Sequence, residues 1–333
     1  MGYKVHSFNI SNKKSKKIKV INNNGELLKT YDVVNFDNCY IDSQDAALIS
    51  DNYIINGNLY NGTNNLIDDS GKCTCCDKKL NTNFSVFIKD NKLYKYSSDG
   101  TISAINENLK WIKVSGVDSG GTVNMQLALT DTSLYYLHRD GTINSLTTST
   151  AYKNVVDICG VYNDATYKTS GYTLDSSGGM MQVDGGPITT NVRYISCCST
   201  GSESVTYGYS LITRDNKWQM QVGYKPATIL ENVKEITPGN TSASNIRQHY
   251  VITLDGALYH CATKYLSQYD TELSKIDDGN WVSLAAFVGL SGAYGVKDGK
   301  VYKLVGTTIT EMPQFGTNNI KIEGVGKFLL YSI

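Results

Sequence analysis

The 333-residue chain lacks several features that mark large functional classes. It has only 4 prolines, and no stretch approaches the roughly 18 apolar residues that a membrane-spanning helix needs. The N-terminal segment from Met1 to Phe8 has no apolar core of signal-peptide length. We therefore expect neither membrane insertion nor classical secretion.

A net charge is also missing, because 31 basic residues balance 31 acidic residues. No overall field attracts nucleic acid or an anionic membrane, so we expect neither as a partner. The one local exception is Lys13-Lys14-Ser15-Lys16-Lys17. This run could contact a polyanion, or it could be an ordinary solvated turn.

The residues that are abundant favour strands and turns. The chain has 24 tyrosines and 30 glycines, together with many threonines, serines and asparagines. Tyrosine, threonine and β-branched residues fit a pleated sheet, whereas glycine and asparagine supply turns. The composition therefore predicts an all-β protein.

A hairpin motif recurs about every 40 residues. It consists of an apolar strand, a turn with Gly or Asn, and a strand that carries tyrosine. The clearest copies are Phe84–Tyr94, His249–Tyr259 and Ala293–Tyr302. Looser copies are Tyr53–Tyr60, Leu127–Tyr135 and Leu211–Trp218. A repeat of this length with several strands in each copy predicts a β-propeller.

An apolar segment that ends in small residues precedes each hairpin. The innermost strand of a propeller blade needs such small residues, because it is crowded around the central channel. These segments are Val33–Cys39, Trp111–Gly116, Val155–Gly160, Val192–Cys197, Val233–Gly239, Trp281–Ala286 and Ile320–Gly324. A further strand follows the tyrosine strand, as in Lys95–Ile105. Each copy thus supplies four antiparallel strands, which is the normal propeller blade.

The two ends of the chain complete one blade between them. Residues 320–333 supply a first and a second strand, and residues 17–30 supply a third and a fourth. Sharing a blade in this way closes the ring and removes open sheet edges. We predict one all-β propeller domain over residues 1–333, with residues 1–16 as an N-terminal extension. It has about eight blades, or seven if the weak copy at Lys72–Cys76 is not a blade.

The pattern resembles the regulator-of-chromosome-condensation family of propellers. The resemblance lies in an Ile-x-x-Gly inner strand followed by hairpins such as Asp255-Gly-Ala-Leu-Tyr259 and Asp298-Gly-Lys-Val-Tyr302. The copies are shorter than that family's repeats, and Tyr60-Asn-Gly62 is the nearest trace of its Trp/Tyr-Gly dipeptide. The resemblance implies a propeller fold and functions that include exchange factors for small GTPases, a β-lactamase inhibitor and domains of viral or surface proteins.

Cysteine is the first candidate for site chemistry. Cys73 and Cys76 have the Cys-x-x-Cys spacing that can place two thiolates on one zinc ion. The alternative is that the eight cysteines are small buried hydrophobes beside the channel, which we favour. They are Cys39, Cys73, Cys75, Cys76, Cys159, Cys197, Cys198 and Cys261. We expect no disulfide framework and no cofactor.

Catalytic residues are not indicated. The aspartates lie mostly in turns, where they cap the backbone, and no two carboxyl groups are marked as a glycosidase pair. The four histidines lie beside strands, with no nucleophile in a recognisable motif. We therefore predict no enzymatic activity.

Exposed aromatic residues are the remaining candidates. Tyr207, Tyr224, Tyr265 and Tyr269 lie in or near longer connecting segments. Tyrosine on a propeller loop suits stacking on a sugar ring or a protein contact, whereas most of the 24 tyrosines are expected to pack between blades. These four are the predicted binding residues.

These patterns favour a non-enzymatic binding or structural module of a larger assembly. Our specific hypothesis is a bacteriophage virion component, such as a tail or receptor-binding protein, assembled in the host cytoplasm. Its partners would be other proteins of the assembly and a host surface glycan. The alternatives are a cytoplasmic protein-binding regulator or inhibitor, and, third, a glycan-active enzyme.

Overall fold

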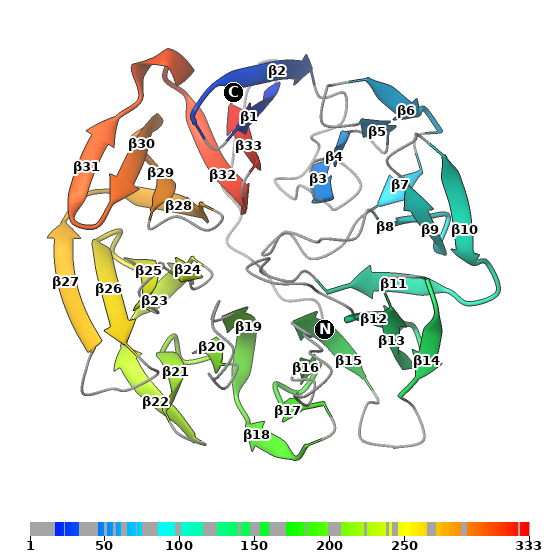
Figure 1. Ribbon diagram of the computed structural model, residues 1–333. Helices are drawn as coiled ribbons and strands as arrows, with labels where there is room; N and C mark the ends of the chain where they lie inside the picture. Colours follow the sequence, from blue (N-terminus) through cyan, green and yellow to red (C-terminus); the bar gives the residue numbers. More distant parts are fainter. Residues whose placement is uncertain are drawn as a thin grey trace.

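The computed structural model shows eight antiparallel sheets arranged around a ring (Figure 1). It describes residues 17–332 except for 23, 33–45, 50–51, 56–57, 61–64, 71, 75–85, 97–100, 116–124, 139–140, 147–153, 160–170, 184, 199–207, 223–224, 238–239, 242–245, 265–270, 288–291 and 326. Within these residues, no helix has the length and apolar character needed to cross a membrane.

Each blade runs from an inner strand at the ring centre to an outer strand at the rim. The first four are β3 (Ala46–Ile49), β4 (Asn52–Ile55), β5 (Asn58–Tyr60), β6 (Leu66–Asp68); β7 (Cys73–Thr74), β8 (Val86–Lys89), β9 (Lys92–Tyr96), β10 (Ile102–Asn106); β11 (Trp111–Val114), β12 (Met125–Thr130), β13 (Leu134–His138), β14 (Ile143–Ser145); and β15 (Val155–Cys159), β16 (Tyr172–Asp175), β17 (Met180–Gln182), β18 (Pro187–Thr189).

The other four complete the ring. They are β19 (Val192–Cys198), β20 (Gly208–Thr213), β21 (Trp218–Val222), β22 (Lys225–Leu230); β23 (Val233–Ile236), β25 (Ile246–Thr253), β26 (Leu258–Lys264), β27 (Thr271–Asp277), with β24 (Asn240–Thr241) beside β25; β28 (Trp281–Ala286), β29 (Ala293–Lys297), β30 (Lys300–Val305), β31 (Thr308–Glu311); and β32 (Asn319–Val325), β33 (Lys327–Ser332), β1 (Lys17–Asn22), β2 (Leu27–Asp32). A 3-10 helix, η3 (Pro313–Phe315), precedes β32.

The predicted eight-bladed propeller is confirmed, because the weak copy at Lys72–Cys76 does form a blade. Its inner strand, β7, is only two residues long. The predicted inner strand Val33–Cys39 lies outside the described residues, and β3 occupies that position in its blade instead. The prediction placed this inner strand too early, because it relied on apolar content and did not recognise the tight β3–β4 hairpin.

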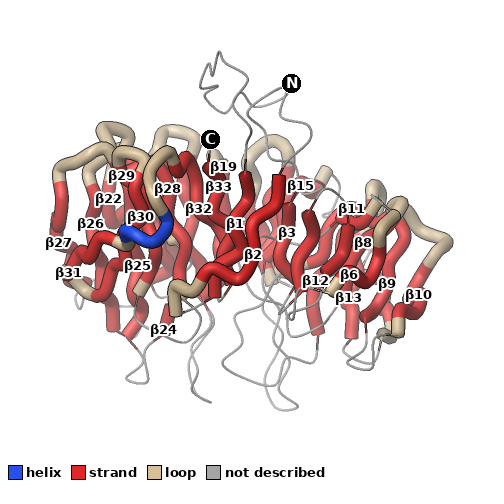
Figure 2. The backbone as a smooth tube through the Cα atoms, turned by 90° about the horizontal axis from the view of Figure 1, so that it is seen from above, coloured by secondary structure: helices blue, strands red, loops and turns tan. Residues whose placement is uncertain are grey.

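The shared closing blade is also confirmed. Strand β33 from the C-terminal end pairs with β1 from the N-terminal end, and Lys17 stands opposite Ser332. Ser332 in turn stands opposite Asn319, the first residue of β32. The start of β1 and the end of β33 therefore lie on one face of the ring, the upper face in Figure 2. Residues 1–16, predicted as an extension, lie outside the described residues.

A repeated backbone hydrogen bond joins neighbouring blades. The first residue of an inner strand donates its N–H to a carbonyl in the turn between the second and third strands of the preceding blade. The pairs are Trp111 to Asn91, Val192 to Gly178, Val233 to Asn216, Trp281 to Gly256 and Asn319 to Gly299, at N···O distances of 2.7, 2.9, 2.8, 3.1 and 2.9 Å. Every acceptor residue has a positive φ, between 60° and 95°. The turn conformation thus aims the carbonyl at the next blade.

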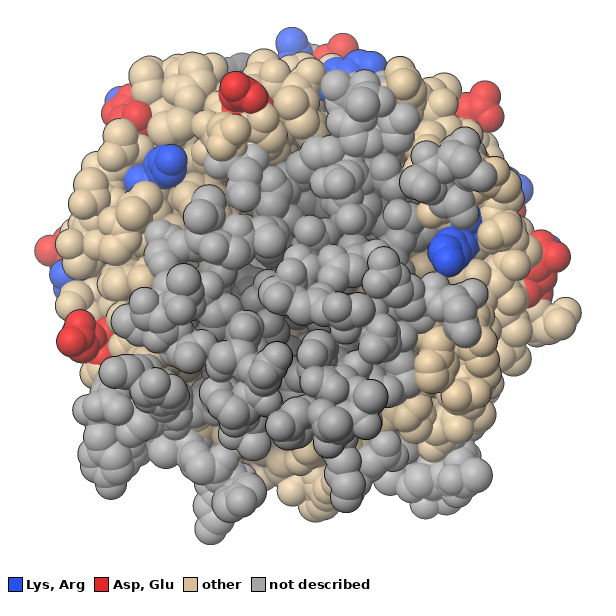
Figure 3. Space-filling view, in the orientation of Figure 1, with Lys and Arg blue, Asp and Glu red and all other residues tan. Residues whose placement is uncertain are grey.

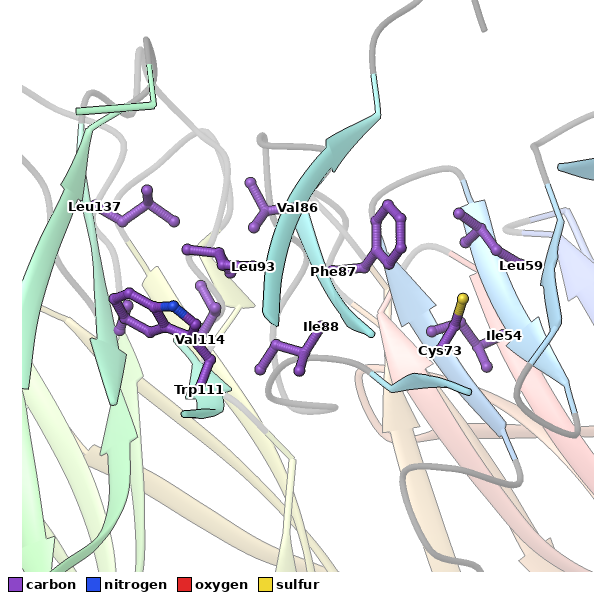
Figure 4. Close-up of a cluster of buried hydrophobic side chains, with 11 residues drawn as sticks. Ile54, Leu59, Cys73, Val86, Phe87, Ile88, Leu93, Trp111, Val114 and Leu137 are labelled. Carbon is purple, nitrogen blue, oxygen red and sulfur yellow. The ribbon is translucent and has the colours of Figure 1, made fainter. Parts of the chain in front are cut away.

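The hydrophobic core lies between the blades. One cluster runs through three consecutive blades, from Ile54 and Leu59 through Phe87 to Trp111 and Leu137 (Figure 4). Since side chains alternate between the two faces of each sheet, every blade contributes to the core on both sides. The ring therefore behaves as a continuous packed structure.

Candidate functional site

The two faces of the ring differ in the length of their connections. On the upper face of Figure 2, the turns between second and third strands have two to four residues; we call this the short-turn face. On the opposite face, the connections from inner to second strand have nine to twelve residues in five consecutive blades. We call this the long-loop face; its long connections are 75–85, 115–124, 160–171, 199–207 and 237–245.

The predicted binding tyrosines belong to connections of the long-loop face. Tyr207, Tyr224, Tyr265 and Tyr269 themselves lie outside the described residues, so their role stays a prediction. The residues that flank their connections are described. They pair as Cys198 with Gly208, Val222 with Lys225, and Thr263 with Thr271.

These flanking pairs belong to two adjacent blades, β19–β22 and β23–β27. In both blades the strands run so that these ends lie on the long-loop face. The Thr263 and Thr271 hydroxyls are 3.0 Å apart and close the base of the connection that carries Tyr265 and Tyr269. The fold thus gathers the predicted segments into one sector of one face.

Two of the long connections start from an arrangement that we call a hydroxyl clamp. In it, a hydroxyl at the end of the inner strand accepts a hydrogen bond from a backbone N–H of the second strand. Ser115 follows β11, and its Oγ accepts the Leu127 N–H at 3.0 Å while its own N–H donates to the Leu127 carbonyl at 2.8 Å. The Gln126 side-chain amide donates to the Ser115 carbonyl at 2.7 Å. All of these groups are buried. The clamp fixes the direction in which the connection leaves the blade.

The same clamp recurs at β23. Thr237 Oγ1 accepts the Tyr250 N–H at 2.9 Å, and the Thr237 N–H donates to the Tyr250 carbonyl at 2.9 Å. His249 takes the place of the glutamine, with Nδ1 3.0 Å from the Thr237 carbonyl. Because a carbonyl only accepts, this nitrogen carries the proton. His249 is therefore part of the scaffold that supports the connection.

Blade β23–β27 has additional strand structure on the long-loop face. Its second strand, β25, has eight residues, and β24 adds a fifth strand against Arg247 and Gln248. The Tyr250 hydroxyl donates to the Gly306 carbonyl of the next blade at 3.1 Å. This longer, braced sheet forms a rigid support beneath the connection that carries Tyr265 and Tyr269.

Figure 3 shows the face opposite the chain ends. The described charged side chains on it are scattered around the rim, with both signs present. The described residues of this face therefore produce no electrostatic field of a single sign.

Polar side chains in the channel wall are directed at the neighbouring inner strand. The Arg193 guanidinium on β19 donates to the Val233 and Lys234 carbonyls of β23 at 2.9 and 3.2 Å. Lys234 donates to the Val282 carbonyl of β28 at 3.3 Å. Each contact satisfies a backbone group on the unpaired inner edge of a sheet.

Other strands of the wall use the same device. Ser283 Oγ donates to the Ile322 carbonyl at 2.7 Å and accepts the Ile322 N–H at 3.3 Å. The Lys113 ammonium forms an ion pair with Asp157 on the next inner strand. These groups hold the ring together, so they explain polar residues that would otherwise suggest a site in the channel.

Glu235 is the most perturbed carboxyl of the described wall. Its Oε1 accepts the Leu284 N–H of the next inner strand at 3.0 Å. Burial raises its pKa to about 6, against the lowering effects of that hydrogen bond and of Lys321 and Lys234. A carboxyl with such a pKa can hold or release a proton near neutral pH.

A second carboxyl, Glu323, acts electrostatically on Glu235. Glu323 forms an ion pair with Lys321 at 2.7 Å and accepts a hydrogen bond from the Tyr331 hydroxyl. Each carboxyl thus already has a structural partner from the fold. No sequence signal marks Glu235, because Val-Lys-Glu-Ile-Thr is an ordinary strand alternation.

Cys73, one of the two predicted zinc ligands, is buried on β7 against Ile54, Leu59 and Phe87 (Figure 4). Burial, with the nearby Asp68 carboxylate, raises the pKa of its thiol to about 12. Since a thiolate is the form that binds zinc, this position favours the small buried hydrophobe. Cys76 lies outside the described residues, and the zinc alternative stays a prediction.

Two other cysteines, Cys159 and Cys261, are also buried. Among the described residues, no three His, Cys, Asp or Glu side chains are grouped so that they could hold a metal ion.

Comparison with known proteins gives similarity in fold alone. No family model matches the chain, and no curated protein matches it. The β-propeller domain of Myceliophteria thermophila Cps50 (Swd1) is 10% identical over 79% of this chain and 97% of that chain, with a TM-score of 0.48. A chain of the Mitotic Checkpoint Complex is 11% identical over 78% and 88%, with a TM-score of 0.47.

PorZ, a surface component of the type-IX secretion system of Porphyromonas gingivalis, is 10% identical with a TM-score of 0.42. This chain covers 74% of its own length but spans only about a third (34%) of PorZ. Two further matches are WD40 propellers. The chain is a β-propeller, and these likenesses do not single out the regulator-of-chromosome-condensation family within that superfamily.

Proposed function

We propose that the chain is a binding module of a larger assembly and that it contacts its partner through the long-loop face. The observation that carries this proposal is the concentration of long connections on one face of five consecutive blades. Connections of a rigid scaffold are where binding residues are concentrated. The polar groups of the described channel wall, in contrast, are directed at neighbouring blades.

The contact sector is formed by blades β19–β22 and β23–β27. The connections that hold Tyr207, Tyr224, Tyr265 and Tyr269 leave from these two blades. Tyrosine gives a large contact area at a small entropic cost and can stack on a sugar ring or fill a protein pocket. The clamp at Thr237 and the bonded Thr263–Thr271 pair hold the bases of this sector in place.

Within this proposal, the specific role is that of a bacteriophage tail or receptor-binding component that contacts other virion proteins and a host surface glycan. It is supported by the Asn-, Lys-, Ile- and Tyr-rich composition and by the occurrence of viral proteins in the propeller family that the repeats resemble. Its place would be the virion, after assembly in the host cytoplasm. Membership of the regulator-of-chromosome-condensation family is proposed on the same Asp-Gly-x-Leu/Val-Tyr hairpins.

The glycan contact is tested by retention of the protein on host cell-wall polysaccharide. Tyr265→Ala with Tyr269→Ala should reduce retention at least tenfold, because each stacking ring contributes about 1 kcal/mol or more. The matched control, Tyr265→Phe with Tyr269→Phe, keeps both rings and should retain most of the binding. Unchanged retention in the alanine variant with an unchanged unfolding temperature would contradict the contact sector.

The virion role is tested separately by fractionation. A virion component should co-purify with intact phage particles in a fixed ratio to the major tail protein. If the chain is found only as free protein, the virion role is wrong, and the alternative of a cytoplasmic regulator or inhibitor that presents this face to a protein partner takes its place.

A further inference from the structure

Blade β19–β22 contains two buried hydroxyl groups without a hydrogen-bond partner in the described part of the chain. They are Ser196 Oγ on inner strand β19 and the Tyr209 hydroxyl on β20. Ser196 is 0% exposed and Tyr209 is 1% exposed. A buried hydroxyl that makes no hydrogen bond lowers stability, so its presence in a native fold needs an explanation.

Ser196 occupies the position of the hydroxyl clamp. Counted from the β-bulge near the start of each inner strand, it is equivalent to Ser115 and Thr237. Those two residues each accept the N–H of a residue of the second strand. The residue opposite Ser196 is Ser210, whose own hydroxyl is already bonded because it accepts the Trp218 Nε1–H at 3.2 Å.

The strand pairing explains why Ser196 Oγ is unused. In the two blades with a clamp, the inner-strand pairing ends one residue before the hydroxyl. In blade β19–β22 the pairing continues through Ser196 to two further pairs, Cys197–Tyr209 and Cys198–Gly208. The backbone of β19, rather than the hydroxyl, therefore pairs with β20 at this point.

We propose that β19 exchanges between this arrangement, which we call zipped, and a clamped arrangement in which the strand ends at Ile195. In the clamped arrangement, Ser196 Oγ accepts the Ser210 N–H and the last two residues of β19 leave β20. The zipped form keeps the two additional backbone pairs, and the clamped form gives the buried hydroxyl its hydrogen bond. These contributions are similar in size, so the two forms are close in free energy and the minor form is populated.

The second strand needs no rearrangement. Gln126 and His249, which donate to the carbonyl of the clamp residue in their blades, are both buried. Tyr209 is the equivalent residue of β20, and its ring lies 5.1 Å from that of Tyr172 in the preceding blade. Strand β20 is also held by β21, which pairs with it as far as Ser210. Only the end of β19 has to move.

The exchange changes the length of one connection on the long-loop face. The segment between the end of β19 and the start of β20 grows from residues 199–207 to residues 197–207. This segment includes Tyr207, so the exchange regulates the reach of one part of the contact sector. That consequence rests on the proposed function, whereas the exchange itself does not.

Hydrogen exchange of the full chain, followed by NMR, tests the proposal without any partner. The amides of Cys198 and Gly208 should exchange at least tenfold faster than the Ser210 amide, through a local opening that does not depend on denaturant. Ser196→Ala removes the hydroxyl that stabilises the clamped form. It should slow exchange at both positions at least tenfold and, in contrast to Ser115→Ala, should not lower the unfolding temperature.

The matched control is Ser210→Ala, which removes the facing hydroxyl and should not slow exchange at Cys198 or Gly208. Exchange of these two amides only through global unfolding would overturn the proposal. Exchange that Ser196→Ala leaves unchanged would overturn it as well.

A proline variant tests the exchange from the clamped side. Cys198→Pro weakens the additional pairs and should shift the blade toward the clamped form, which Ser196 stabilises. The folding equilibrium constant should therefore fall at least tenfold more for Cys198→Pro in the Ser196→Ala background than in the parent protein. Additive effects would overturn the proposal. None of these measurements involves polysaccharide retention, so the exchange and the contact sector stand or fall separately.

Discussion

At the scale of single residues, the turn positions between second and third strands join the blades. Asn91, Gly178, Asn216, Gly256 and Gly299 occupy this position in five blades, and each has a positive φ. Glycine adopts this backbone conformation without steric cost, and asparagine tolerates it better than other residues. The Asp-Gly and Asp-Asn pairs of the repeat are therefore needed for the contact with the next blade as well as for the turn itself.

Single side chains in the channel wall also have measurable consequences. Glu235→Gln keeps an oxygen for the Leu284 N–H but removes the ionisation. Since burial raises the pKa of Glu235 in the folded protein to about 6 from its ordinary value of 4.5, the folded protein resists losing this proton. Its stability should fall as pH rises from about 4.5 to 6, by about 2 kcal/mol, and stay at that lower level above pH 6.

The measurement is urea unfolding of both proteins from pH 4 to pH 7.5. The Glu235→Gln variant should gain stability relative to the parent protein across this window, because the cost of ionising Glu235 is gone. A difference between the two proteins that is constant with pH, or that favours the parent at pH 7, would contradict the assigned pKa shift.

At the scale of elements, the ends of the inner strands determine how the long connections leave their blades. The hydroxyls of Ser115 and Thr237 each replace a backbone acceptor for one residue of the second strand. This pattern could have been noticed from the sequence, where inner strands end in Ser, Thr or Cys. A repeat pattern identifies those residues only as small, because it does not show where a hydroxyl points.

The clamps predict specific costs. Thr237→Val keeps the shape of the side chain but leaves the buried Tyr250 N–H without its acceptor, which should lower the free energy of unfolding by about 1–3 kcal/mol. Ser115→Ala should cost a similar amount through Leu127, and the double variant should show the sum, because the two clamps lie in different blades.

Chemical denaturation of the three variants checks these values. The control Thr308→Val, at an exposed position on outer strand β31, should change stability by less than about 0.5 kcal/mol. Equal stability of Thr237→Val and the parent protein would show that the clamp is dispensable.

At the scale of the whole molecule, the closing blade decides whether a ring forms. Deleting residues 327–333 removes β33 and with it the fully buried side chains of Phe328, Leu330 and Tyr331. Each such loss costs roughly 2–5 kcal/mol, so the total is comparable to the entire stability of a typical domain, about 5–15 kcal/mol. It also leaves β1 and β32 with open edges. We expect this variant to aggregate or to lose cooperative unfolding.

Moving the strand should rescue the ring. Lys17 and Ser332 are directly opposite, so residues 327–332 can be placed before Lys17 through a short glycine-containing hairpin linker in place of residues 1–16. This rearranged chain should elute as a monomer and unfold cooperatively, as judged by size-exclusion chromatography and calorimetry. A deletion variant that unfolds at the parent temperature would contradict a structural role for the shared blade.

Sequence patterns alone are enough to predict the repeat, the four strands of each blade and the closure of the ring by the chain ends, and they leave a choice between eight and seven blades. These features follow from local patterns: strand alternation, glycine and asparagine in turns, and incomplete copies at both ends. The folded ring shows what these patterns do not: the turn carbonyls, Arg193, Glu235 and Ser283 contact the next blade, and the connections of the four tyrosines leave from one sector. The inter-blade contacts join residues 14 to 49 positions apart in the sequence, and the relative placement of these residues depends on how each sheet twists and packs against its neighbour.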